Sequence, residues 1–447
     1  ALPIFMEQTQ KQRLGFGFFG WMLMIFQGGA FFTQVVFTNY PMNILADFYG
    51  GATFVPVVFT VGTFIAIILQ LILSRFIGKI KNMKNLTLIF GAISLAMGCV
   101  ITFYPVPYGV SAVWIAAYFI ESVCVNMYCT FTCGILVGQW FPRRKGTIMG
   151  ITTIMFPVGN GLISVFAANV FKTGQPDPAS AFLPYLIACI ATWLVGLIFV
   201  KDYPEQCGAY RDNDRSFTPE MARKMMEEEI ENKKTTVWTT GHTLANRDFW
   251  FISIVCGFLL MFSVGMMTQT AAIVGQFESL NYATVMMLIM IFGIIGSYVL
   301  GVIDTAIGTK KAIAIAVVIM ILSGVFGMIQ NAGCLIVSLI LLAVFMGASS
   351  NFTVSAAAQY WRREDFSSVF ACLNPIANIF NAIAPTVIAF LLYTSLGYRL
   401  CFAVTAICGV ISLILILLFS GKHVKEVDDK YRQEAGKALD DELSSRK

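Results

Sequence analysis

The residue with the most conspicuous chemistry is Glu121. It separates two stretches that contain no Asp, Glu, Lys or Arg, residues 86–120 and 122–142. A carboxylate deep in an apolar span is costly unless it is paired, hydrated or protonated, and burial favours its neutral form. A carboxyl that takes up and gives off a proton is what a proton-coupled carrier requires. Glu121 is therefore our candidate proton-coupling residue; the alternative is a protonated Glu bonded to a neighbouring helix.

Uncharged polar side chains recur in the other apolar stretches. Two sets of three have the spacing i, i+4, i+7, which places their members on one helix face, and Tyr128 shares a face with Glu121 in the same way. Amides donate and accept hydrogen bonds, so they suit a neutral or weakly polar ligand; the alternative role is bonding between helices. The candidate substrate-pathway residues are Gln27, Phe31 and Gln34; Asn374, Asn378 and Asn381; and Asn126, Tyr128, Asn160, Gln269 and Asn351.

Long apolar runs must position these side chains. Hydrophobic residues make up 57% of the 447 positions and charged residues 12%, against about 25% charged in soluble domains. In a bilayer, apolar runs of about 20 residues must be helical to satisfy their backbone. The first run is too long for the apolar region of a cleavable signal peptide. We predict twelve spans, near residues 14–40, 52–73, 84–104, 110–140, 145–171, 180–200, 248–275, 281–303, 311–330, 332–361, 366–393 and 398–420.

The positions of the cationic residues test this topology. If both termini are cytoplasmic, only Lys172 and Arg399 of the 30 Lys and Arg residues fall on the outer side. Such a bias follows the rule that cytoplasmic loops carry the excess of Lys and Arg. We therefore predict a multi-pass protein of the cell's inner (plasma) membrane with both termini in the cytoplasm.

The chain divides into two halves. We predict an N-terminal six-helix bundle over 1–200, a cytoplasmic linker over 201–247, a C-terminal six-helix bundle over 248–420 and a charged cytoplasmic tail over 421–447. Thr218 and Pro219 favour the start of a short amphipathic helix in the linker. The halves also echo each other: residues 29–34 resemble 265–269, and residues 139–144 resemble 359–363. Two matches in register indicate a duplicated, pseudo-symmetric bundle.

One loop carries a family resemblance. Residues 301–311 contain Gly301, Asp304, Gly308 and a basic pair, and the matching loop after the second span has Ser74 in place of the acid. This pattern, with the span count and the central linker, resembles the major facilitator superfamily. The resemblance implies alternating access and an inner gate, for which the candidates are Gly301, Asp304 and Gly308 with Arg143, Arg144, Arg362 and Arg363. Salt bridges between the halves at these residues are expected to hold the gate closed.

The substrate class is less narrowly indicated. Residues 202–208 and the arginine pair after the fourth span resemble the oxalate/formate antiporter and monocarboxylate-like branch of the superfamily, which favours an organic acid or amphipathic monocarboxylate. The eighth and eleventh spans contain no Lys, Arg or His, which disfavours a dicarboxylate. A multidrug or metabolite efflux antiporter is the alternative.

Other functional classes are remote. A membrane enzyme needs a reactive constellation, whereas both histidines, His242 and His423, fall outside the predicted spans. A channel needs filter loops or charged rings, and the sequence suggests neither. We expect no cofactor, metal or nucleic-acid partner. The expected partners are a small-molecule substrate, protons or a counter-solute, and the lipid bilayer, and the family resemblance suggests a monomer.

Overall fold

The computed structural model describes residues 15–39, 41, 45–49, 54–74, 76, 80, 82–105, 110–171, 177–232 and 236–445. Every regular element within these ranges is a helix, and 12 helices there are long and apolar enough to cross a membrane. The predicted helical membrane fold is confirmed. Lys172, which the topology places on the outer side, lies outside the described ranges, as do residues 75 and 77–79 of the loop after the second span.

Six spans form each half. Those of the N-terminal half are α1 with the π-helical η1 (Phe18–Gln34, Val35–Asn39), α4 (Phe54–Ser74), α5 (Met83–Phe103), α6–η3–α7 (Ala112–Val125, Asn126–Thr132, Cys133–Trp140), α8–α9 (Lys145–Thr152, Met155–Phe171) and α10 (Pro178–Phe199). Those of the C-terminal half are α13–α14 (Arg247–Thr268, Thr270–Val274), α15 (Tyr282–Ile307), α16 (Thr309–Met328), α17–α18 (Ala332–Ser349, Asn351–Tyr360), α19 (Phe366–Leu392) and α20 (Tyr398–Leu418). A short helix, α3 (Ala46–Tyr49), follows the first span.

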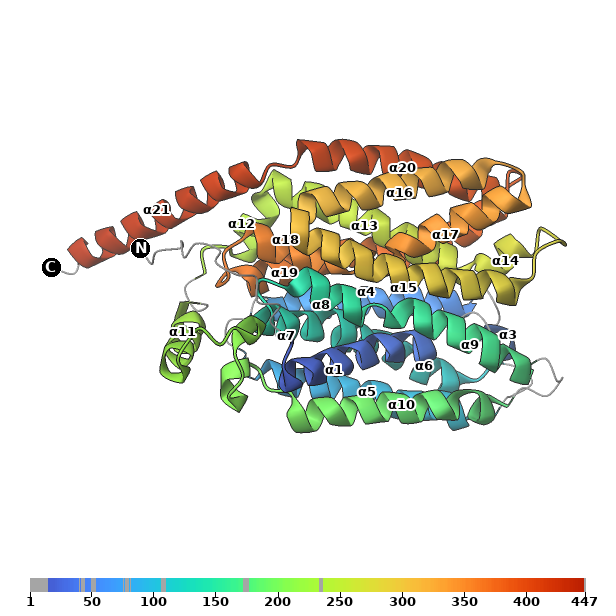
Figure 1. Ribbon diagram of the computed structural model, residues 1–447, viewed down its shortest axis with the longest axis horizontal. Coiled ribbons are helices and arrows are strands. Elements are labelled where there is room, and N and C mark those ends of the chain that lie inside the picture. Colours follow the sequence, from blue (N-terminus) through green and yellow to red (C-terminus); the bar gives the residue numbers. More distant parts are fainter. Residues whose placement is uncertain are drawn as a thin grey trace.

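The linker and the tail gather at one end of the molecule. The linker holds η4 (Pro204–Cys207), η5 (Arg211–Asn213), α11 (Pro219–Asn232) and α12 (Thr240–Ala245), and the tail forms α21 (Gly421–Ser445). Thr218 Oγ1 accepts a hydrogen bond from Met221 N at 3.3 Å, so the helix start predicted there is confirmed. The two halves lie side by side along the long axis, with α11, α12 and α21 all at the same end, here called the linker end (Figure 1).

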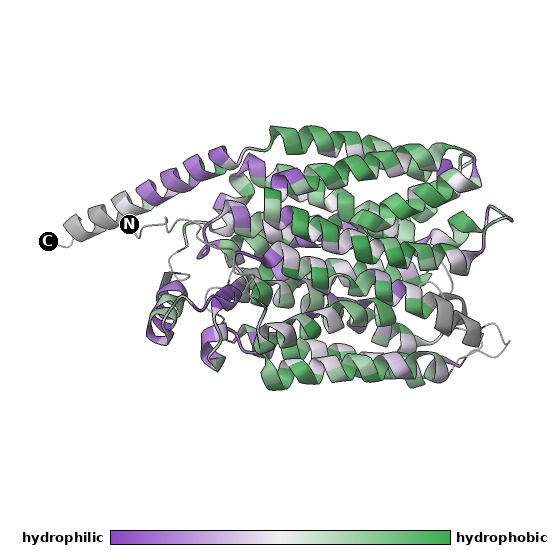
Figure 2. Cartoon of the chain, viewed as in Figure 1, coloured by the Kyte–Doolittle hydropathy of each residue, from purple (hydrophilic) through white to green (hydrophobic). Residues whose placement is uncertain are grey.

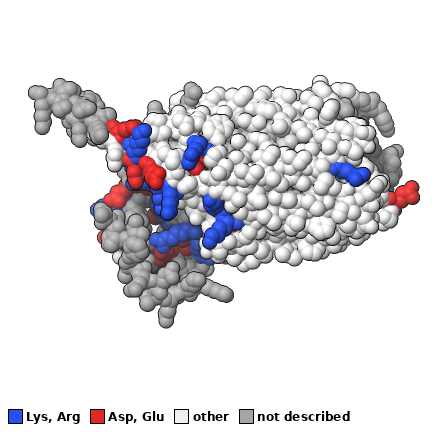
Figure 3. Space-filling view, turned by 90° about the horizontal axis from the view of Figure 1, so that it is seen from above, with Lys and Arg blue, Asp and Glu red and all other residues white. Residues whose placement is uncertain are grey.

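The surface agrees with a membrane setting. Apolar residues cover the flanks of the bundle, and hydrophilic residues concentrate at the linker end (Figure 2). Lys and Arg are also densest there, whereas the visible flank is almost free of charge (Figure 3). Burial differs between spans of the same half. Buried residues make up 94% of the apolar window of the fourth span but 22% of that of the sixth. The fourth span is therefore central and the sixth is peripheral.

Five of the described spans are interrupted; the fourth contains the π-helix η3, and the tenth breaks between α17 and α18. The fifth breaks between α8 and α9 at Thr153, because Pro157 lacks an N–H for the carbonyl of Thr153 and its ring crowds it. The first changes to π-helix directly after Gln34, and the seventh breaks at Gln269. The last two breaks fall in the repeated segments 29–34 and 265–269, so the sequence echo marks equivalent irregularities in the two halves.

Candidate functional site

A cavity lies between the two halves. Its volume is about 50 Å³. The N-terminal half contributes residues from α1, α4, α8 and α9, and the C-terminal half contributes residues from α13, α17, α18 and α19. The lining residues are Phe31, Gln34, Phe59, Met149, Phe156, Asn160, Leu260, Ser263, Val264, Met267, Thr268, Met346, Ser349, Ser350, Val354, Asn374, Asn378 and Asn381.

One wall of the cavity is a row of asparagine amides on α19. Asn378 Nδ2 donates to the carbonyl of Asn374 at 2.9 Å, and Asn381 Nδ2 donates to Asn378 Oδ1 at 3.3 Å. Asn374 Nδ2 in turn donates to Gln70 Oε1 of α4 at 3.3 Å, across the seam. The side-chain oxygen of Asn381 is buried without a partner, and Pro385 removes the helical donor of its backbone carbonyl. Unsatisfied acceptors at a cavity wall are well suited to receive a donor from a ligand.

Gln34 and Thr268 bring polar groups from equivalent places in the two halves. Gln34 ends α1 and Thr268 ends α13, so each stands at the break in its span. Gln34 Oε1 accepts from Cys129 Sγ at 3.2 Å, and the Thr268 hydroxyl donates to the carbonyl of Gly265 at 2.8 Å. The duplication therefore places one hydrogen-bonding residue from each half in the cavity wall.

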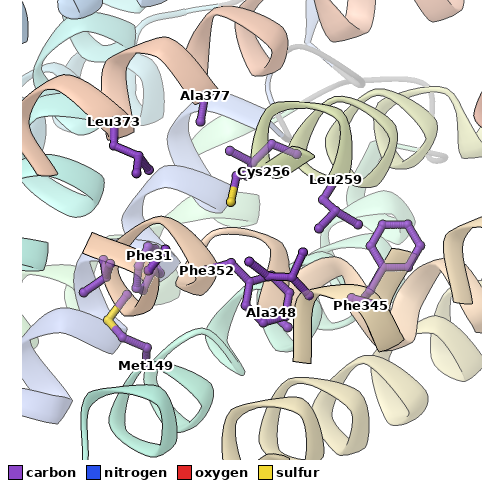
Figure 4. Close-up of a cluster of buried hydrophobic side chains, with 14 of the residues drawn as sticks. Phe31, Met149, Cys256, Leu259, Phe345, Ala348, Phe352, Leu373 and Ala377 are labelled. Atoms are coloured by element: carbon purple, nitrogen blue, oxygen red, sulfur yellow. The ribbon is translucent and has the colours of Figure 1, made fainter. Parts of the chain in front are cut away.

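The rest of the wall is apolar. The rings of Phe31 and Phe156 lie 4.9 Å apart, between centroids. Phe31 and Met149 belong to the same buried cluster as Phe352 and Ala348 of the C-terminal half (Figure 4). Methionine and aromatic side chains adapt to varied apolar shapes.

No described residue that lines the cavity is Asp, Glu, Lys, Arg or His. A charged ligand would therefore lose its hydration without gaining a counter-charge, which is expensive in a low-dielectric site. An uncharged ligand with hydrogen-bonding groups meets no such penalty.

Six of the eleven predicted substrate-pathway residues line this cavity: Phe31, Gln34, Asn160, Asn374, Asn378 and Asn381. The other five lie elsewhere, and four of them are almost fully buried. Gln27 Nε2 approaches Met149 Sδ at 3.2 Å, Asn126 Nδ2 donates to the Ser122 carbonyl at 2.7 Å, and Asn351 Nδ2 donates across the seam to Thr153 Oγ1 at 3.0 Å. Tyr128 packs inside the N-terminal half, and Gln269 precedes α14 beside Thr268.

Several lining residues on α13 and α17 were not predicted from the sequence. Leu260, Ser263, Val264 and Met267 have the spacing i, i+3, i+4, i+7, and Met346, Ser349 and Ser350 repeat its first part. This spacing is visible in the sequence. Hydroxyls and methionines are also common on packed helix faces, so the spacing alone does not distinguish a cavity wall from packing.

Glu121 lies inside the N-terminal half and is not among the residues that line the cavity. Its side chain is 0% exposed, and its Oε1 accepts a hydrogen bond from Ser94 Oγ of α5 at 2.8 Å. Its other oxygen, Oε2, has no partner. The buried acid is thus separated from the cavity wall.

The loop residues of the family resemblance meet the other half at the linker end. The Asp304 carboxylate lies beside Gly146 in the first turn of α8, and its Oδ1 accepts from Thr309 Oγ1 at 2.6 Å. A helix N-terminus favours such a negative charge. Gly301 lies directly on α8, since a Cβ there would be 2.9 Å from the Cα of Gly150. Gly308 has φ +90°, which only glycine adopts without strain, and it separates α15 from α16.

Known proteins share the fold and the loop pattern described above. The sequence matches the profile of the Major Facilitator Superfamily over residues 29–329 and 278–445. The chain belongs to this family. Members of the superfamily are transporters, so the chain is a multi-pass membrane transporter. No curated protein sequence matches it.

Solved structures of this superfamily share the fold. The human organic anion transporter MFSD10 (TETRAN) is 12% identical, with a TM-score of 0.62 over 92% of this chain and 100% of the other. The proton:xylose symporter XylE bound to 6-bromo-6-deoxy-D-glucose is 12% identical, with a TM-score of 0.66 over 92% of this chain and 98% of the other. At such low identity the similarity establishes the fold alone.

Two of the arginines that the superfamily resemblance assigned to the gate contact the linker. The backbone N–H groups of Arg143 and Arg144 donate to the Asp212 carboxylate at 3.2 and 3.1 Å. Arg143 Nη1 lies 3.4 Å from Asp214 Oδ2, and the Arg144 guanidinium lies 4.4 Å over the ring of Phe16. Burial raises the pKa of Asp212, although the two N–H groups partly offset this effect. The linker thus binds the turn between the fourth and fifth spans through the carboxylate of Asp212.

The other two arginines pair with the linker and the tail. Arg363 Nε lies 2.9 Å from Glu229 Oε2 of α11, which also pairs with Arg211, and Arg362 Nε lies 2.7 Å from Asp428 Oδ2 of α21. Burial lowers the pKa of Arg363, and Glu229 partly offsets this effect. The described ion pairs of Arg143, Arg362 and Arg363 are thus with the linker and the tail, and the role of the four arginines in an inner gate stays a prediction. The linker and the tail fold back under the bundle, which places their acidic side chains next to the arginines.

Proposed function

We propose that the chain is a secondary active transporter that carries a small amphipathic solute in uncharged form. The supporting observation is the cavity at the seam, to which both halves contribute amides and apolar side chains, the C-terminal half adds hydroxyls, and no described lining residue is ionisable. Alternating access requires a site that both halves share, so that rocking exposes it to each side in turn. The contacts of Asp304 and Gly301 with α8 must separate when the linker end opens.

The predicted substrate, an organic acid or amphipathic monocarboxylate, fits this proposal in its undissociated form. A monocarboxylic acid that carries its proton presents one donor and one acceptor, which match the free acceptor of Asn381 and the amides beside it. A dicarboxylate would have to take up two protons. The monocarboxylate-like branch within the superfamily is part of this proposal.

Binding at different pH values tests this proposal. We would measure thermal shifts of the purified protein with short aliphatic monocarboxylic acids and with the primary amides of the same chains, from about pH 5 to about pH 8. Only the undissociated acid is competent to bind, so the apparent affinity for the acids should fall about tenfold per pH unit. The affinity for the amides should stay constant. An affinity for acids that does not change with pH would show that the cavity accepts the carboxylate, contrary to the proposal.

The proposal includes proton coupling through Glu121 and a cytoplasmic linker end. The concentration of Lys and Arg at that end supports the orientation. A multidrug or metabolite efflux antiporter is the second candidate, favoured by the phenylalanines and methionines of the cavity wall. Counterflow in proteoliposomes distinguishes a carrier from a channel, because only a carrier shows trans-stimulation. Larger aromatic solutes that bind better than short acids would favour the efflux candidate.

A further inference from the structure

Ser94 differs from the other hydroxyl residues of α5. Thr87 and Thr102 donate to the backbone carbonyls four residues earlier, Met83 and Gly98, at 2.9 and 2.8 Å. This local bond is the usual choice of Ser and Thr inside helices. Ser94 instead donates across to Glu121 of α6 at 2.8 Å, and both side chains are 0% exposed.

Nothing else described around Glu121 compensates a negative charge. The titratable groups near it are Tyr118 and Cys124 on α6 and Cys189 on α10, and none of them is basic. The elements α1, η1 and α4, which also pack against α6, contain no titratable side chain, and η3 adds Tyr128 and Cys129. On α5, Lys84 lies ten residues from Ser94, about 15 Å along the helix, and its Nζ donates to the Leu197 carbonyl at 2.9 Å. Among the described residues, Ser94 is the one hydrogen-bond donor to this carboxyl.

We infer that Ser94 is a positioning residue for the coupling proton, because its hydroxyl stabilises the Glu121 carboxylate after the proton has left. The inference rests on the proposed role of Glu121. When the carboxyl is protonated, the hydroxyl of Ser94 is free to turn to the carbonyl of its own helix, as those of Thr87 and Thr102 do. When the carboxyl is ionised, the bond to Glu121 is the one that is needed. Without this bond, Glu121 should keep its proton at higher pH.

The test is an infrared titration of the protein in lipid nanodiscs. The stretching band of the protonated carboxyl is followed against pH and assigned to Glu121 by its loss in Glu121→Gln. In Ser94→Ala, the midpoint of this titration should move up by about one to two pH units, the size expected for a hydrogen bond to a charged group. Ser94→Thr keeps the hydroxyl and should restore the original midpoint. The control is Ser122→Ala, since Ser122 is equally buried and adjacent to Glu121 but donates to the Tyr118 carbonyl at 2.8 Å. Its midpoint should not move.

The outcomes separate the two proposals. If the native band titrates and neither Ser94→Ala nor Ser122→Ala moves its midpoint, the role of Ser94 is overturned and that of Glu121 stands. If the native band does not titrate at all, the role of Ser94 is also overturned. If Ser94→Ala does not fold, Ser94→Thr against Ser94→Cys, a weaker donor of similar size, gives the same comparison. The role of Glu121 itself fails in a different experiment, if Glu121→Gln still accumulates a primary amide, which carries no proton of its own, on a proton gradient.

Discussion

The central cavity and the surroundings of Glu121 bury polar groups in different ways. The cavity lies between the halves, is lined by amides from both and hydroxyls from the C-terminal half, and contains no charge among its described lining residues. Glu121 lies within one half, has one hydrogen-bond partner and leaves one oxygen unpaired. The first arrangement suits a solute that must enter and leave. The second suits a single group whose protonation state matters.

This difference indicates that solute binding and proton binding are separate in space. A route between them passes through α4. Ser122, next to Glu121, packs on one side of α4 at Gly62, where a Cβ would lie 2.8 Å from the Ser122 Cβ. On its other side, Thr60 Oγ1 donates to the Ala382 carbonyl of α19 at 3.0 Å. A shift of α6 on protonation would therefore reach the cavity wall through one helix. Spatial continuity is not itself coupling, so variants at Glu121 and at the cavity wall are needed to measure the coupling between the two sites.

The largest effect is expected for Glu121→Gln. The Gln amide has the shape of the protonated acid but cannot release a proton. Accumulation of a primary amide, which carries no proton of its own, on a proton gradient should therefore be lost by more than about tenfold. Exchange of solute for solute should persist, because the cavity is unchanged. Uptake and counterflow in the same proteoliposomes measure both quantities. Accumulation that remains intact would show that Glu121 has no coupling role.

The next effect is expected for Asn378→Leu. Leucine has a similar volume but cannot bond either ligand or Asn381, so affinity should fall by about tenfold for each hydrogen bond lost to the ligand. The measurement is the thermal-shift titration with the primary amides. Asn126→Leu is the control, since Asn126 is equally buried, donates to the Ser122 carbonyl and is not among the residues that line the cavity. If the two sites are separate, Asn378→Leu should lower the affinity for the primary amides by the same factor in the native protein and in Glu121→Gln.

A gain of function is expected for Asn160→Lys. Asn160 lines the cavity and is partly exposed, so an ammonium placed there stays hydrated and adds the missing counter-charge. Binding of monocarboxylates should then persist at neutral pH, severalfold stronger than in the native protein, whereas binding of the primary amides should not improve. Asn160→Gln is the neutral control. If native and Asn160→Lys proteins show the same pH dependence for acids, the absence of charge in the cavity is not what excludes the carboxylate.

The fold could be predicted from the sequence because the bilayer leaves few alternatives. Apolar runs of span length, separated by charged loops, determine the number of helices. Five of the six predicted residues at the cavity followed from helical spacing in α1 and α19, and Asn160 of α9 from its place within a span. The interruptions were less accessible. Pro157 indicates the break at Thr153, but the π-turn after Gln34 has no proline or glycine to announce it.

The partners of long side chains could not be predicted. Arg362 and Arg363 are neighbours in sequence and equal in charge, yet one pairs with the tail and the other with the linker. Which acid they meet depends on how the linker and tail fold under the bundle, and helical periodicity contains no information on that. The separation of Glu121 from the cavity has the same origin: depth in the span was readable, but the face that meets the seam was not.

The smallest effect is expected for Arg363→Gln, and it sharpens the comparison by disturbing neither polar region. Arg363 belongs to the C-terminal half and pairs with Glu229 of the linker, whose neighbouring Asp212 binds the turn after the fourth span. The linker therefore ties the halves together at this end. Arg363 is partly buried, but Glu229 keeps its pair with Arg211 when Arg363 is replaced. Loss of the Arg363 pair should therefore weaken the closed arrangement by about 1 kcal/mol, which corresponds to a fewfold rise in the open population. Spin-label distances between the linker ends of the two halves would report this rise. Arg362→Gln is the matched control, because Arg362 pairs with the tail of its own half and should leave the distances unchanged. Equal responses of the two variants would mean that the linker does not hold the halves together, and the contacts of Asp304 and Gly301 with α8 would then have to close this end alone.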